Sequence, residues 1–166
     1  MDAYLERIQE FGDQLGPSHP QMGPKHITTL VSFLELLPKD LDVFVEFRHR
    51  DWFEKENSDL VFPVLEKLKK GMVITDAAGR RDCVHMRLTS AEVFIRFVCN
   101  SLHPSDYARI DEWVGRIKKW HGEGLQRCYF FLHQHEELYS PELCKYLIEQ
   151  LNENCNTSIQ VPVFVK

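Results

Sequence analysis

Val43-Phe44-Val45-Glu46-Phe47-Arg48-His49-Arg50-Asp51-Trp52-Phe53 is the most informative stretch of this chain. Its first five residues are β-branched or aromatic apart from one glutamate, and they predict a strand over Val43–Phe47. Because side chains alternate along a strand, Glu46 and Arg48 share one face, and the other face is apolar. An apolar face packs against helices, so the charged pair is expected on the opposite side, near the carboxyl end of the strand. Trp52, which follows directly, is expected close to this pair.

The segments on either side alternate between the two kinds of secondary structure. Strands that alternate with amphipathic helices pair in parallel through right-handed crossovers. Both an open doubly wound sheet and a barrel fit this order, and the glycine-rich turn of dinucleotide-binding sheets is absent. Helices are expected over residues 2–15, over Ile27–Leu37, from Ser58-Asp59 to Gly71 with Pro63 in the first turn, from Pro104 past Trp120 and from Ser140 through Leu151; strands are expected over Met72–Thr75, Val84–Leu88, Val93–Val98 and Cys128–Leu132, with a loop over Asp76–Asp82.

Composition narrows the class of protein. The net charge of −5 argues against bulk electrostatic binding to nucleic acid or to an anionic membrane surface. No apolar run is long enough to cross a membrane, and the first residues lack the pattern of a signal peptide. The five scattered cysteines are typical of small core residues in a reducing compartment. We therefore expect one cytoplasmic domain over residues 1–166, and the sequence indicates no particular cofactor.

Further ionisable residues come from other predicted strands. Asp76 follows the Met72–Thr75 strand, and Arg96 interrupts an apolar strand, where a charge must be paired or face a cavity. Asn100 is expected on the same face as Arg96. A barrel enzyme carries its site at the carboxyl ends of the strands, but structural ion pairs also fill barrel interiors. From the residues alone, a site and a structural Glu–Arg pair are about equally good interpretations.

His133 and His135 follow the Cys128–Leu132 strand and could lie on one face. Two such histidines, with a carboxylate from Asp76 or Glu46, could bind a metal ion. An isolated H-x-H pattern is more often a polar loop beyond a strand, and this is the interpretation that we favour.

The stretch Val45–Phe53 resembles the signature V-E-x-R-H-x-x-W-F of the YecE-like family, domain of unknown function 72. Weaker similarities extend over most of the chain: Leu15-Gly16-Pro17, Thr75-Asp76, Val93–Phe97 and Tyr129–Gln134 resemble the family's L-G-P, T-D, V-Y-V-R-x and Y-x-Y-F-N-N elements. The resemblance implies a TIM-barrel-like (β/α) fold and no established activity. It favours a functional role for the matching residues Glu46, Arg48, His49, Trp52, Asp76 and Arg96.

Two departures from the family pattern affect these expectations. The opening G-x-S/T-G-W strand is missing, and a complete barrel takes roughly 250 residues. We therefore expect an incomplete barrel whose first strands are missing, and self-association through exposed strand edges. His133 and Gln134 replace the family's asparagine pair.

Three functions remain open at this point. The first is an enzyme that binds a phosphorylated or carboxylated small molecule through Arg48 and Arg96, with Arg80 or Arg81 as a further candidate. Trp52 and Asn100 would line the site, and Glu46, Asp76 and His49 would be the acid/base groups. The second is a metal-dependent hydrolase or isomerase that uses His133 and His135. The third is a binding module without catalysis, or a truncated gene product without function.

Overall fold

The fold is an α/β arrangement built on one parallel sheet, as seen in a computed structural model that describes residues 24–38, 41–134 and 136–163. Four strands are paired in the order β1-β2-β3-β4, and each pair is parallel. The strands are β1 Phe44–Glu46, β2 Gly71–Ala77, β3 Glu92–Val98 and β4 Arg127–His133. Parallel pairing and the alternation of strands with helices were both predicted and are confirmed.

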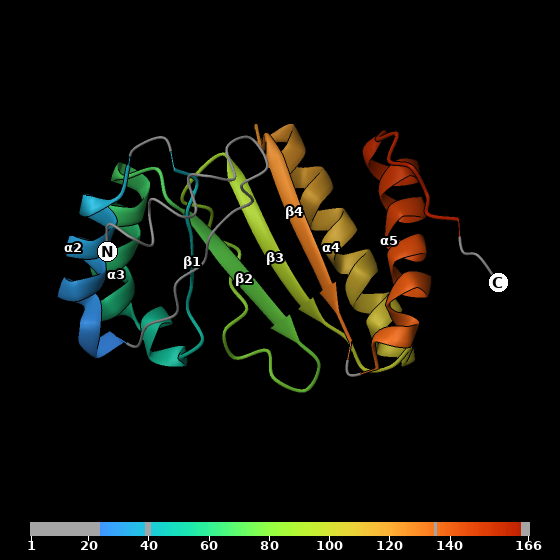
Figure 1. The fold of residues 1–166 in the computed structure, drawn as a ribbon, viewed down its shortest axis with the longest axis horizontal. Helices are drawn as coiled ribbons and strands as arrows, with labels where there is room; N and C mark the ends of the chain where they lie inside the picture. Colours follow the sequence, from blue (N-terminus) through green and yellow to red (C-terminus); the bar gives the residue numbers. More distant parts are fainter. Residues whose placement is uncertain (1–23, 39–40, 135, 164–166) are drawn as a thin grey trace.

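The helices connect and flank these strands (Figure 1). They are α2 Ile27–Leu36, α3 Lys55–Lys67, α4 Pro104–Gly122 and α5 Ser140–Cys155, with short 3₁₀ turns at Pro24–His26, Arg50–Phe53 and Glu137–Tyr139. The expectations for Ile27–Leu37, for the helix from Pro104 and for the helix from Ser140 are confirmed. The predicted helix over residues 2–15 lies outside the described residues. None of the described helices combines the length and apolar character needed to cross a membrane.

The prediction for α3 was wrong at both ends. The helix begins at Lys55 and ends at Lys67, so Ser58 lies inside it and Pro63 is its ninth residue rather than part of its first turn. A proline inside a helix removes one backbone hydrogen bond. Pro63 lies on the exposed side of the helix, where water can satisfy the carbonyl that loses its partner, while the buried Val61, Phe62 and Leu65 hold the opposite side in place.

The predicted strand over Val84–Leu88 is also wrong. β2 pairs directly with β3, which leaves no position in the sheet for another strand between them. The connection from β2 to β3 contains no helix, and it lies against α3 instead. There the ring of His85 packs 5.0 Å from Phe53 and 6.0 Å from Phe62, and Arg87 pairs with Glu66.

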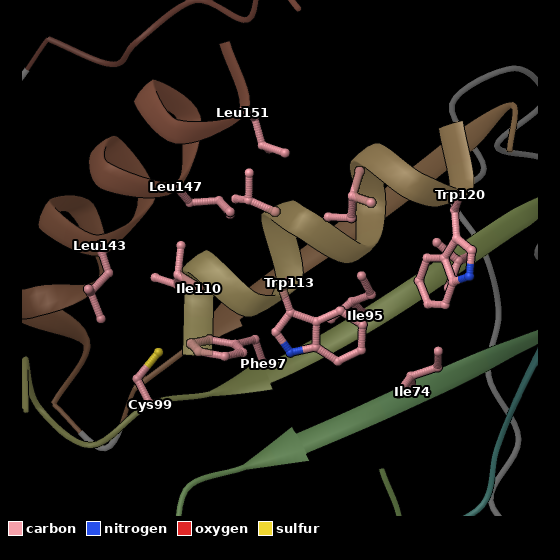
Figure 2. Packing of buried hydrophobic residues seen from close by; sticks show 13 residues of the cluster. Ile74, Ile95, Phe97, Cys99, Ile110, Trp113, Trp120, Leu143, Leu147 and Leu151 are labelled. Carbon is pink, nitrogen blue, oxygen red and sulfur yellow. The ribbon is translucent and has the colours of Figure 1, made fainter. Parts of the chain in front are cut away.

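The four helices of the described residues cover one face of the sheet. Val45 and Met72 lie in a cluster with residues of α2 and α3, whereas Ile74 and Ile95 lie in a second cluster with residues of α4 and α5. Val45 is in register with Met72, and Ile74 with Ile95, so the two clusters share one face of the sheet. Figure 2 shows the second cluster, in which Trp113 and Ile110 of α4 lie between the strands and the leucines of α5.

The opposite face of the sheet, which we call the inner face, is filled by aromatic rings near the amino-terminal ends of the strands. Phe44 is 2% exposed and contacts Phe94 and Tyr129 at ring distances of 5.9 and 5.6 Å. The ring of Phe44 also lies directly over Gly71, where an added Cβ would come within 2.4 Å of it. Gly71 is therefore required for this close approach, and the polar residues of the inner face lie further along the strands.

Candidate functional site

The carboxyl ends of the strands bring polar side chains together on the inner face. Thr75 is in register with Arg96 in the neighbouring strand. Glu46 is in register with Val73, and Val73 lies two residues before Thr75, so Glu46, Thr75 and Arg96 share the inner face. Arg48 follows β1 and reaches the same place. The alternation that predicted Glu46 and Arg48 on one side, away from the helices, is therefore confirmed, and Arg96 joins them.

Glu46 is the centre of this group. Its side chain is fully buried, and its Oε1 accepts a hydrogen bond of 2.7 Å from the Thr75 hydroxyl. The guanidinium groups of Arg48 and Arg96 each lie 3.6 Å from the same oxygen. Both arginines reach solvent, since Arg48 is half-exposed and Arg96 is 24% exposed. One buried carboxylate is thus shared between two partly exposed arginines, and each guanidinium group carries five N–H donors.

A cavity of about 200 Å³ adjoins this group. Arg80 closes one side, where its Nη2 donates to the Arg48 carbonyl over 3.1 Å and its Nε pairs with Asp82. The guanidinium groups of Arg48, Arg80 and Arg96 line the cavity, and the nearby carboxylates are those of Glu46 and Asp82. The positive groups are in excess, so the cavity favours an anion. The cavity is lined by Arg48, Thr75, Ala77, Arg80, Asp82, Cys83, Arg96, Val98 and His133.

The cysteine in this cavity is not activated as a nucleophile. Burial raises the pKa of the Cys83 thiol, and the neighbouring Asp82 carboxylate raises it further. Since the thiolate is the reactive form of cysteine, Cys83 stays protonated at neutral pH. The chemistry of the site therefore belongs to its carboxylate, hydroxyl and guanidinium groups.

His133 lies at the rim of the cavity, where its Nδ1 is 2.5 Å from Oε1 of Glu137 and its ring stacks on Phe131. The second histidine of the predicted metal pair, His135, lies outside the described residues. Within the described parts of the chain, no three His, Cys, Asp or Glu side chains are placed to hold a metal ion.

The structure separates Asp76 from the other predicted site residues. Asp76 belongs to β2 rather than to a loop, and it lies on the face that the helices cover. Its two oxygens accept hydrogen bonds from Arg109 over 2.9 Å and from the Trp113 indole over 2.8 Å, and Arg81 lies 3.3 Å away. The expected position of Asp76 beside Glu46 is wrong. Side chains alternate along β2, so Asp76 points to the same helix-covered face as Met72 and Ile74.

Trp52 also lies away from the cavity. The 3₁₀ turn at Arg50–Phe53 directs its fully buried indole onto the Phe47 ring, at a centroid distance of 4.2 Å, within the core beneath α2 and α3. The expectation that Trp52 lines the site is corrected accordingly. His49 is exposed and begins the same turn, with its Nδ1 accepting from the Asp51 amide and lying 3.2 Å from the Asp51 carboxylate.

Asn100 does not share the face of Arg96, as the sequence had predicted. β3 ends at Val98, and the chain then turns through Ser101 and Leu102, which both have positive φ. Asn100, which lies between the end of β3 and this turn, lines a separate hollow at the start of α4, and its backbone N–H donates to both oxygens of Asp106. Asn100 therefore belongs to the structure of the turn.

Sequence reasoning missed two partners of the predicted carboxylates. Thr75 donates to Glu46, and strand parity with Arg96 in the next strand could have revealed it. Arg109 pairs with Asp106 over 2.8 Å as well as with Asp76. Asp106, Arg109, Ile110 and Trp113 follow the helical spacing of a buried stripe, so an ion pair on the core side of α4 was detectable from the sequence.

Known proteins similar to this chain share the same architecture. The model of the family described as "Protein of unknown function DUF72" matches residues 1–163. UPF0759 protein YecE of Escherichia coli (strain K12) is 24% identical over 173 residues, which cover 90% of this chain. A DUF72 family protein, EF0366 of Enterococcus faecalis V583, superposes with a TM-score of 0.70 at 14% identity, over 94% of this chain and 68% of that chain.

A second solved structure, the DUF72 family protein TM1631 of Thermotoga maritima MSB8, has a TM-score of 0.55 at 17% identity and covers 80% of this chain and 56% of that chain. At these identities, the two solved structures bear on the fold alone. The chain spans 63% of the length of the curated YecE protein.

Proposed function

The chain belongs to the DUF72 family of proteins of unknown function, and from this premise we propose that it binds a small phosphorylated or carboxylated molecule at the Glu46 cavity and acts on it by general acid/base chemistry. The observation that carries the proposal is the convergence of Arg48, Arg96 and Arg80 on one cavity at the carboxyl ends of parallel strands. This is the end of the sheet at which α/β proteins bind ligands.

The arginines are the anion-binding groups in this proposal. Arg48 and Arg96 lie 3.6 Å from the Glu46 carboxylate, a distance beyond that of a charge-assisted hydrogen bond. Their planar donors suit the oxygens of a phosphate or carboxylate better than a lysine would. An incoming anion would accept hydrogen bonds from these two guanidinium groups in place of water.

Glu46 is the acid/base group. It is buried beside the cavity, and the Thr75 hydroxyl fixes one of its oxygens. Such a carboxylate can take a proton from a substrate held by the arginines and return it. His133, at the rim, is better placed than the exposed His49 to exchange that proton with solvent. We assign Asp76, Trp52 and Asn100 no part in this chemistry.

We also propose that the chain is a single domain and a partial (β/α) barrel. The strand order follows the chain without reversal, and all four helices cover one face of the sheet. A doubly wound sheet reverses its strand order and carries helices on both faces. The superposition of 94% of this chain on 68% of EF0366 supports a consecutive segment of a larger fold.

Titration with inorganic phosphate and with small phosphorylated metabolites tests the proposed site. We expect saturable, salt-sensitive binding by the intact protein. Arg48→Ala and Arg96→Ala should each weaken it at least about 10-fold, since each removes a charged partner of the anion. Arg50→Ala is the matched control, because Arg50 is 75% exposed and contacts the cavity nowhere.

Glu46→Gln separates binding from chemistry. It keeps the shape and the acceptor for Thr75 but removes the charge, so anion binding should be retained or improved while any turnover is lost. If folded Arg48→Ala and Arg96→Ala proteins bind every tested anion as tightly as the parent does, the proposed site is refuted.

A further inference from the structure

β4 forms the end of the sheet in the described part of the chain, and an apolar groove lies beside it. β4 is paired with β3 along one edge, and the described residues provide no strand along the other. Beneath α5, the groove has a volume of about 430 Å³ and is lined by side chains of α4, β4 and α5, chiefly Ile117, Cys128, Phe130, Leu147, Leu151 and Cys155. Phe131 of β4 is 53% exposed on the inner face.

The segment after α5 starts at the end of this groove and then leaves it. Asn156, with φ of 55°, ends the helix. Asn152 holds the turn that follows: its side chain donates to the Ile159 carbonyl over 2.9 Å and accepts from the Ile159 amide over 2.8 Å. In Figure 1 the chain then runs outward from α5, on the side away from β4.

This segment has the composition of a strand but is not paired as one. Ile159, Val161 and Val163 alternate with Gln160 and Pro162, so that their three β-branched side chains would share one face of a strand. Val163 is 87% exposed and Ile159 is 43% exposed. Proline lacks an amide donor and is therefore typical of the outermost strand of a sheet, where its backbone faces water.

We propose that residues 159–163 of one copy of this chain pair, as an added edge strand, with β4 of a second copy, and that Val161 and Val163 occupy the groove beneath the α5 of that copy. Among the described residues, no strand pairs with the edge of β4 that faces away from β3, so this edge supplies backbone donors and acceptors and the groove supplies the apolar surface. The Asn152 turn favours a second copy over self-pairing, because it directs the segment away from its own β4. If each copy places its residues 159–163 on the β4 of the other copy, the two copies form a closed dimer.

The test is the concentration dependence of the molar mass of the intact chain, measured by light scattering and sedimentation. The parent should dimerise. Val161→Lys and Val163→Lys should each raise the dimer dissociation constant about 10-fold or more, because each places a charge in an apolar groove. Gln160→Lys is the matched control on the opposite face of the added strand and should leave the dissociation constant unchanged.

A fluorescent peptide of residues 157–166 distinguishes the possible occupants of the groove. It should bind saturably to a monomeric Val161→Lys/Val163→Lys chain, whose own segment can no longer dock. Its own double-lysine version should not bind. A parent chain that stays monomeric at high concentration while the variant binds the peptide would mean that each chain pairs with its own edge. A double variant that remains dimeric would place the interface elsewhere. Either result overturns the proposal.

Discussion

Glu46 and Asp76 are both fully buried carboxylates near the carboxyl ends of adjacent strands, yet they lie in opposite environments. Asp76 lies on the helix-covered face, where Arg109 and Trp113 donate to its two oxygens at 2.8–2.9 Å. Glu46 lies on the inner face, where it accepts a hydrogen bond of 2.7 Å from Thr75 and its two arginines lie 3.6 Å away beside a cavity.

The difference separates a structural ion pair from a candidate site. Both oxygens of Asp76 accept a hydrogen bond from a buried donor of α4. This carboxylate therefore ties β2 to α4 and serves the structure of the core. The partners of Glu46 are partly solvated and their geometry is loose. A ligand can therefore replace water at the exposed parts of Arg48 and Arg96.

The largest expected effect compares the two carboxylates directly. Asp76→Asn should lower the free energy of unfolding by about 3–5 kcal/mol, because it leaves the buried Arg109 without one of its two carboxylates. Glu46→Gln should cost less than about 1 kcal/mol, since water can solvate the half-exposed Arg48 and the exposed part of Arg96. Urea unfolding of both variants at neutral pH measures the two values. Equal losses would show that the Glu46 group is as structural as the Asp76 group.

His85 adds a pH dependence of its own, because the pKa of its imidazole differs between the folded and the unfolded chain. Its ring nitrogens are buried, and this burial lowers the pKa of His85 from 6.5 to about 4. Between these values the unfolded chain binds a proton that the folded chain does not, so the free energy of unfolding should fall by up to about 3 kcal/mol as the pH drops from 6.5 to 4. Above pH 6.5 this residue should have no effect.

The measurement is urea unfolding across this pH range for the parent and for His85→Phe. The variant should lose most of the pH dependence between pH 6.5 and 4, which leaves the titration of the carboxylates visible below it. An unchanged pH profile in the variant would assign the loss of stability to other groups.

The smallest expected effects come from the neutral donors. Trp113→Phe removes the indole donor from Asp76 and should cost about 1–2 kcal/mol. Thr75→Val removes the hydroxyl from Glu46 and should cost about 1 kcal/mol or less, because two guanidinium groups remain near the same oxygen. Thermal unfolding of the two variants ranks their losses of stability. A larger loss of stability for Thr75→Val would contradict the view that the Glu46 group is held less tightly than the Asp76 group.

Strand parity accounts for most of what the sequence predicted correctly. It placed Glu46 and Arg48 on one side of β1 and pointed to Arg96 as a charge that needs a partner. The same rule, applied to β2, places Asp76 with Met72 and Ile74 on the helix face. The error over Asp76 arose because the strand was predicted to end at Thr75, so that the carboxylate was assigned to a loop.

Other features depend on contacts that no local pattern contains. The 3₁₀ turn after β1 directs Trp52 onto Phe47, and the end of β3 at Val98 leaves the backbone N–H of Asn100 to bind Asp106. The crossover from β2 to β3 lies against α3 without forming a strand, because the sheet offers it no partner. Pro63 is tolerated inside α3 because tertiary packing of Val61 and Leu65 outweighs its local cost.

The strand order of the sheet has a consequence for the way in which the chain folds. Within the part of the chain that the structure describes, each strand is paired only with strands adjacent to it in the sequence. The backbone segment that must close to form any one pair is therefore short, and its entropic cost is modest. Each new strand can join a sheet edge that is already formed, so the ladder can grow stepwise from the amino-terminal side as the polypeptide leaves the ribosome. During this growth, the most recently added strand always carries the unfilled edge.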